Sequence, residues 1–174
     1  MHEKLVGHAP RGIYQGKPNE NTRNRVLEVG GFHYDSDAYC DDLPFWNTES
    51  GKPHLIVPYT LSENDMRFAI PNGFSHGGEF FTYLKDSLDY LLEEGRDGAP
   101  KMMNVGLHCR LVGRPGRAKA LAQFIDYAKS LPDVWICRRD EIAHHWYENH
   151  WPEGHGEAPA ECLVPPVGVK KARA

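Results

Sequence analysis

One histidine in this sequence stands where a side chain could carry out acid–base chemistry. His108 ends the apolar segment 101–107, which is typical of a strand. In α/β proteins the carboxyl ends of strands face the mouth at which ligands bind. An imidazole placed there can protonate a leaving nitrogen near neutral pH. His108 could equally be a strand-end side chain that only hydrogen-bonds a loop carbonyl, and the residues alone leave both interpretations open.

Acidic and polar side chains follow two other apolar segments. Asp35 and Asp37 are two residues apart, and such a pair can hold a cation, orient a histidine or accept hydrogen bonds from substrate N–H groups. Asn64, Asp65 and Arg67 place an amide, an acid and a guanidinium in a row, which suits a small, flat, polar substrate. Each group also fits an ordinary loop turn, so the residues alone do not decide between the two roles.

Metal and nucleotide motifs do not occur in the sequence. The four cysteines are far apart and lack the Cys-x-x-Cys pairing of zinc sites, so we expect reduced thiols. His144 and His145 are adjacent, and adjacent side chains diverge by about 100° on a helix, which prevents both from simply sharing one metal. The glycine-rich segments match neither a Walker A loop nor a dinucleotide fingerprint. We therefore expect no metal site.

The composition limits the classes of protein to which the chain can belong. With 174 residues, 40% of them hydrophobic and 25% charged, it is typical of one globular domain. The net charge of -4 disfavours a nucleic-acid partner, because phosphate-binding faces need clustered Lys and Arg. No apolar run approaches the roughly 18 residues of a membrane span, and the first residues lack the apolar core of a secretory signal. We expect a cytoplasmic protein that binds neither nucleic acid nor a membrane.

Hydrophobic periodicity predicts strands and helices that alternate along the chain. Such alternation favours parallel β/α units, in an open sheet or in a piece of a larger barrel. Residues 1–18 are expected to be loops around a brief strand, and residues 38–52 have little regular pattern. The prolines beyond Trp151 are typical of a disordered tail. Strands are predicted over 12–14, 32–34, 54–59, 101–109 and 134–137. Helices are predicted from a cap at Asn19 or Asn21 to Val29, over 80–95 and 115–131, and from Asp140 through Tyr147.

Seven segments of the sequence recur in the order of one known family. They are GIYQGK (12–17), GFHYDSD (31–37), DDLPFW (41–46), GKPHLIVPYT (51–60), NDMRF (64–68), FFTYLKD (80–86) and GLHCRLVGRP (106–115). Together they resemble the allantoinases of the polysaccharide deacetylase superfamily, the urate-catabolism type, over roughly residues 5–151.

This resemblance implies an α/β fold: about half of a distorted, seven-stranded (β/α) barrel of the polysaccharide-deacetylase type. Residues 1–151 would form the C-terminal half of that barrel, and 152–174 a disordered tail. The implied activity is that of a hydrolase of carbon–nitrogen bonds, which opens allantoin to allantoate in purine catabolism. His108 would be the catalytic general acid. The residues expected to bind the substrate or orient His108 are Lys17, Asp35, Asp37, Asn64, Asp65 and Arg67.

The sequence also departs from the family pattern. Family members are nearly twice as long, and their first acid and histidine motifs have no counterpart here. Lys17 stands where the family has an arginine, so the charge is kept but the bidentate fork is lost.

The expected partners are therefore a small ureide substrate and further copies of the chain in a homo-oligomer, with no cofactor. One alternative is a chitin-type polysaccharide deacetylase, for which a divalent metal such as zinc would be expected. Another is a truncated, non-catalytic remnant that self-associates or pairs with a full-length subunit.

Overall fold

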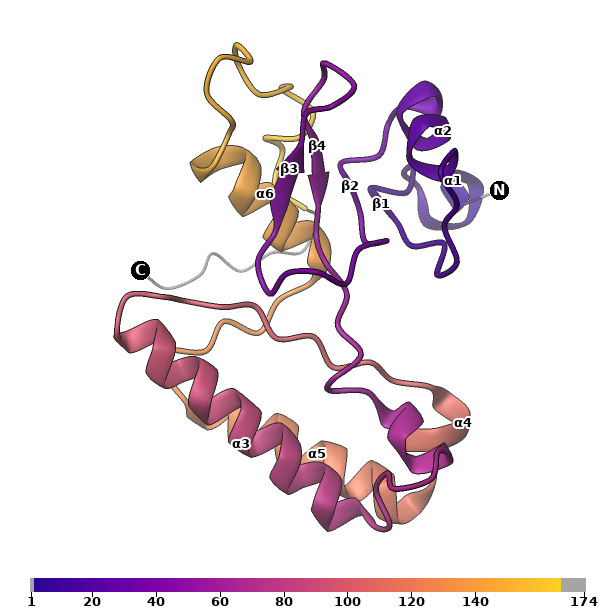
Figure 1. Cartoon of the computed structure of the whole chain (residues 1–174), viewed down its shortest axis with the longest axis vertical. Helices are drawn as coiled ribbons and strands as arrows, with labels where there is room; N and C mark the ends of the chain where they lie inside the picture. The colour runs from indigo at the N-terminus through magenta and orange to yellow at the C-terminus, as the bar shows by residue number, and fades with distance from the viewer. Residues whose placement is uncertain (1, 167–174) are drawn as a thin grey trace. The chain divides into compact units, whose positions relative to one another are not determined.

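A computed structural model describes residues 2–166 (Figure 1). The chain divides into two compact units. The sheet unit comprises the chain up to Tyr59 together with the chain from Cys137 onward, and the helical unit is Thr60–Ile136. Among the described residues, no helix combines the length and the apolar character needed to cross a membrane.

The sheet unit is built on a four-stranded sheet with the order β1-β2-β4-β3. Strands β1 (Gly12–Ile13), β2 (Tyr34–Asp35) and β4 (His54–Ile56) are parallel, and β3 (Phe45–Asn47) pairs with β4 in the antiparallel sense. All of β4 is buried, as expected for a parallel strand covered on both faces. The parallel β/α arrangement confirms the predicted α/β class.

In the described part of the sheet unit there are three helices: α1 (His2–Val6), α2 (Thr22–Val29) and α6 (Arg139–Asn149). Helix α6 packs beside β3, because the ring of Trp46 lies 4.9 Å from that of Tyr147. The Tyr147 hydroxyl donates to the His33 carbonyl at 3.0 Å, which ties α6 to the residue before β2. Figure 1 shows α6 close to the antiparallel strand pair.

The helical unit is organised around two long helices, α3 (Gly77–Arg96) and α5 (Pro115–Ser130), which lie side by side in Figure 1. Gly77 allows their close approach, since a Cβ there would stand 2.5 Å from the Gly116 carbonyl oxygen. Two short elements complete the unit, the 3-10 helix η1 (Asp65–Ala69) and α4 (Cys109–Val112). The buried core consists of Phe80, Leu84, Leu88, Val112, Ala120, Phe124 and Ala128.

Several predicted elements differ from the structure. The strands predicted over 101–109 and 134–137 are wrong: in the described chain the first forms only a single parallel bridge, Asn64 with Gly106, and the second forms none. Short apolar segments become strands only when a neighbouring strand pairs with them, and the sequence does not reveal that neighbour. The prediction that residues 1–18 form only loops and one strand is also wrong, because α1 lies there.

Beyond α6 the chain continues in turns as far as the described residues extend. The Trp151 indole N–H donates to the Gly156 carbonyl at 3.0 Å, and Cys162 is buried. Residues 167–174, the end of the tail predicted over 152–174, lie outside the described residues. Disorder of that tail stays a prediction.

Candidate active site: two acid–histidine pairs

The predicted general acid is paired with a buried aspartate in the helical unit. Asp65 begins η1, and His108 directly precedes α4. The Asn64–Gly106 bridge joins the two segments, since Asp65 N donates to the Gly106 carbonyl at 2.9 Å. His108 Nδ1 then lies 2.7 Å from Asp65 Oδ1.

The contacts of Asp65 fix the position of the His108 ring. Asp65 is fully buried, and its Oδ2 accepts the backbone N–H groups of His108 (2.8 Å) and Val112 (3.1 Å). An ionised carboxylate only accepts hydrogen bonds, so Nδ1 of His108 carries the proton between the two side chains. Nε2 is then the nitrogen available for proton transfer, and the side chain is 30% exposed. This arrangement suits a general acid or base.

Two of the other residues predicted beside Asp65 have local contacts of their own. Asn64 Oδ1 accepts from Met66 N at 2.9 Å and so caps η1. The Arg67 guanidinium lies over the rings of Phe74 and Tyr83, at 4.8 and 4.6 Å from their centroids. Of the residues predicted in this segment, Asp65 is therefore the one that the structure brings into contact with His108.

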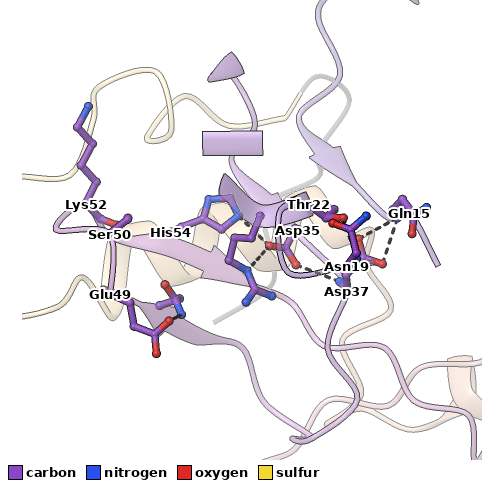
Figure 2. A network of polar contacts seen from close by, with 11 residues as sticks. Gln15, Asn19, Thr22, Asp35, Asp37, Glu49, Ser50, Lys52 and His54 are labelled. Atoms are coloured by element: carbon purple, nitrogen blue, oxygen red, sulfur yellow. Dashed lines mark hydrogen bonds and ion pairs between the residues drawn. The ribbon is translucent and has the colours of Figure 1, made fainter. Parts of the chain in front are cut away.

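A second acid–histidine pair lies in the sheet unit (Figure 2). Asp35 Oδ2 lies 3.0 Å from His54 Nε2 and 3.0 Å from Arg23 Nε, and Asp35 Oδ1 accepts from Asp37 N at 3.0 Å. Burial raises the pKa of Asp35, but the hydrogen bonds from His54, Arg23 and the Asp37 backbone outweigh this effect and lower it to about 2. Asp35 is thus a buried, ionised acceptor.

Asp37 orders the loop that follows β1. Its carboxylate accepts from Gln15 N at 2.9 Å and from Gly16 N at 2.8 Å. Gly16 has a φ of 81°, a conformation that glycine adopts without strain. Lys17 follows with an exposed side chain, and its backbone N–H donates to Gln15 Oε1 at 2.6 Å. The carboxylate of Asp37, predicted to bind substrate, is therefore held by backbone donors.

His54 and Arg23 were not among the predicted site residues. His54 lies within an apolar segment, where a histidine reads as a core residue, and Arg23 lies within a helical pattern. A buried histidine needs a hydrogen-bond partner, and that requirement is the one signal that could have singled it out.

A pocket of about 310 Å³ opens beside this second pair. Its lining combines carboxylates, a guanidinium and small polar groups from β2, the segment after β2, α2 and the loop before α2. The lining residues are Pro18, Asn19, Glu20, Thr22, Arg23, Val26, Asp35 and Asp37.

The residues of the two pairs do not form a metal site. Within the described part of the chain, no three or more His, Cys, Asp or Glu side chains are grouped so that they could hold a metal ion. In each pair the histidine nitrogen that faces the carboxylate is hydrogen-bonded to it. The expectation that the protein uses no metal stays a prediction.

Known proteins are similar to this chain over most of its length. A Schizosaccharomyces pombe protein named "Putative polysaccharide deacetylase" is 44% identical over a 156-residue alignment that covers 82% of this chain and 49% of that protein. A solved structure described as a "probable Polysaccharide deacetylase from Pseudomonas aeruginosa PAO1" is 54% identical with a TM-score of 0.80, over 85% of this chain and 50% of that one. The solved PuuE allantoinase is 55% identical with a TM-score of 0.79, over 85% of this chain and 49% of that one. No family model matches the chain.

These similarities support the polysaccharide deacetylase superfamily as the family of this chain. The α/β fold matches polysaccharide deacetylase structures over about half of their length. The chain spans about half the length of the relatives it matches, and its correspondence to their C-terminal half stays a prediction.

Proposed function

We propose that this chain carries part of the active site of a hydrolase that cleaves a carbon–nitrogen bond in a cyclic ureide, as an allantoinase does. The observation that carries the proposal is the contact between His108 Nδ1 and the buried carboxylate of Asp65, at 2.7 Å. A relative that is 55% identical and described as an allantoinase supports the choice of substrate.

The chemistry requires a proton donor for the leaving nitrogen. Water adds to the ring carbonyl and gives up its protons to solvent as the carboxylate forms. The C–N bond breaks, and the departing nitrogen takes a proton from a donor, because an amide anion is a poor leaving group. In this proposal His108 donates that proton from Nε2, while Nδ1–H remains hydrogen-bonded to Asp65. The buried carboxylate accepts a hydrogen bond from Nδ1 and holds the ring in one orientation.

The second candidate is a deacetylase that acts on an N-acetylated sugar. Two relatives, at 44% and 54% identity, carry polysaccharide deacetylase in their names. Both reactions break an amide bond and use the same proton donor. The substrate therefore distinguishes the two candidates.

The experiment adds the half of an allantoinase that has no counterpart in this chain. The chain is fused to the remaining half of PuuE allantoinase, and hydrolysis of allantoin is compared with deacetylation of an N-acetylglucosamine oligomer. We expect turnover of allantoin, and a decrease of about 100-fold or more in kcat for His108→Ala, with a smaller change in KM. The matched control is His145→Ala, an exposed histidine on α6, for which we expect unchanged turnover.

Each remaining outcome counts against a stated part of the proposal. Deacetylation without allantoin hydrolysis would favour the second candidate. A fused protein that folds and hydrolyses neither substrate would favour a non-catalytic chain. Near-normal turnover in His108→Ala would leave that histidine a structural side chain.

A further inference from the structure

Three tyrosines lie together in the sheet unit, each just beyond the carboxyl end of a parallel strand. Tyr14 directly follows β1, Tyr39 follows β2 by four residues, and Tyr59 follows β4 by three. The rings of Tyr14 and Tyr59 are stacked with centroids 5.0 Å apart, and Tyr39 meets Tyr59 edge to face at 6.1 Å. We call these residues the tyrosine triad.

The triad is anchored from one side and open to solvent on another. The Arg139 guanidinium lies 5.6 Å from the centre of the Tyr59 ring. That guanidinium also donates to the carbonyl of Pro58, the neighbour of Tyr59. Tyr14 and Tyr39 are 48% and 46% exposed, which is high for aromatic residues that contact one another. An anchored and half-exposed aromatic cluster at this end of a parallel sheet is placed where α/β proteins bind ligands.

The hydroxyls of Tyr14 and Tyr39 leave one hydrogen-bond donor available at the edge of the triad. The Tyr14 and Tyr39 hydroxyl oxygens are 2.9 Å apart, so one donates to the other. The hydrogen bond with Tyr14 is the main reason that the pKa of Tyr39 rises to about 12, and Tyr39 therefore stays protonated at neutral pH. Because each phenol carries one hydrogen, the hydroxyl that accepts in this pair keeps its own hydrogen for a further acceptor.

We propose that the tyrosine triad is a binding platform for the planar ring of a cyclic ureide, stacked on an exposed ring with a ring carbonyl facing the hydroxyl pair. This proposal rests on the proposed function for the chemical class of the ligand, and its residues all belong to the sheet unit. A planar ring with carbonyl acceptors matches an aromatic face beside a phenol donor. A sugar would bring several hydroxyls that each need a partner, and the triad offers only its phenol hydroxyls.

The test measures binding of hydantoin, a planar cyclic ureide, to the full chain by ligand-observed NMR titration. Tyr39→Leu removes a ring that is exposed, and circular dichroism verifies that the variant is folded. We expect it to weaken hydantoin binding by about 3- to 10-fold, the size of one aromatic stacking contact. Tyr39→Phe keeps the ring and loses the hydroxyl, so we expect a smaller loss. Tyr90→Leu is the matched control, because Tyr90 is 64% exposed on α3 of the helical unit, and binding should not change.

The outcomes separate this inference from the proposed function, because no turnover is measured. The triad is overturned as a platform if hydantoin does not bind saturably, or if Tyr39→Leu binds it as tightly as the unaltered chain does. Preferential binding of N-acetylglucosamine with the same sensitivity to Tyr39 would overturn the ureide as the ligand. Near-normal turnover of the His108→Ala fused enzyme would instead overturn the proposed function, and the hydantoin binding result would still stand.

Discussion

The carboxylate of Asp65 holds both the backbone and the ring of one residue, His108. Oδ2 accepts the His108 backbone N–H at 2.8 Å, and Oδ1 lies 2.7 Å from Nδ1 of the ring. The same Oδ2 accepts Val112 N at 3.1 Å, inside α4. One buried carboxylate therefore fixes the position of the His108 ring and the beginning of the helix that follows it.

We expect Asp65→Ala to lower the free energy of unfolding by about 3 kcal/mol or more. The change leaves three donors without their charged acceptor, and one hydrogen bond to a charged group is worth about 1.5–3 kcal/mol. The measurement is urea unfolding followed by circular dichroism. Asp86→Ala is the control, since Asp86 is exposed on α3, and its effect should stay within about 0.5 kcal/mol. Equal effects of the two substitutions would contradict a structural role for Asp65.

The Asp35 carboxylate should make the protein sensitive to acid. Its pKa is about 2 in the folded state against an ordinary value of 3.8, so the folded protein binds this proton less readily than the unfolded chain. A depressed pKa contributes stability above the unfolded value, and that stability is lost as the pH falls from about 5 through 2. The shift corresponds to about 2 kcal/mol.

Unfolding free energies measured between pH 6 and 2 check this expectation; the range follows from the two pKa values. Asp35→Asn cannot ionise, so its stability should fall less steeply over that interval than that of the unaltered chain. Asp41→Asn is the matched control, because Asp41 is exposed, and its profile should follow the unaltered one. Parallel profiles for Asp35→Asn and the unaltered chain would mean that Asp35 is not held ionised by its neighbours.

The long helices of this fold and the places of β1, β2 and β4 could be predicted, whereas β3 could not. Helices α3 and α5 follow apolar residues at three-and-four spacing, and the structure places them within three residues of the predicted bounds. Strand β3 has three residues and exists because β4 pairs with it, an interaction that a local pattern does not contain. The same reason explains the incorrect strands at 101–109 and 134–137.

The candidate site was predicted as separate residues rather than as contacts. Asp65 and His108 are 43 residues apart, and the sequence offered no measure of their distance. His54 was missed because the residues around it are apolar, although its ring partners the predicted Asp35. Arg67 was predicted to meet substrate, but a guanidinium can also be satisfied by aromatic faces, and Phe74 and Tyr83 supply them here.

We expect the protein to retain much less than one zinc ion per chain. Zinc sites in proteins use three or four side-chain ligands, and the described residues contain no grouping of three acidic, histidine or cysteine side chains that could supply them. We expect metal analysis after dialysis, on protein purified without a histidine tag, to give well below stoichiometric zinc. Stoichiometric zinc would contradict this expectation and favour the deacetylase candidate.

We expect the chain to self-associate through apolar side chains of the helical unit. Leu107, Trp135 and Ile136 are 45%, 46% and 56% exposed, and large exposed apolar residues favour association. Light scattering at micromolar concentration should detect dimers or larger species, and Ile136→Glu should shift them toward monomer. Tyr90→Glu on α3 is the control and should leave the distribution unchanged. A monomer at every concentration would contradict the expected homo-oligomer.

Arg139 should be the residue of α6 on which the carboxyl ends of β2 and β4 most depend. Its Nη1 donates to Ser36 Oγ and the Val57 carbonyl, each at 2.8 Å, and both terminal nitrogens donate to the Pro58 carbonyl at 3.2 Å. We expect Arg139→Gln to lower the free energy of unfolding by about 2–3 kcal/mol, because charged donors are removed from acceptors that stay half-buried or buried. Arg139→Lys should recover only part of the loss, since an ammonium cannot reproduce the planar fork.

Arg138→Gln is the matched control at the preceding position. The Arg138 side chain is 55% exposed, and its ion pairs with Asp140 and Glu141 should be worth less than about 1 kcal/mol. Urea unfolding of the three variants measures these losses. Equal decreases in the free energy of unfolding for Arg138→Gln and Arg139→Gln would mean that the guanidinium of Arg139 does not hold these strand ends.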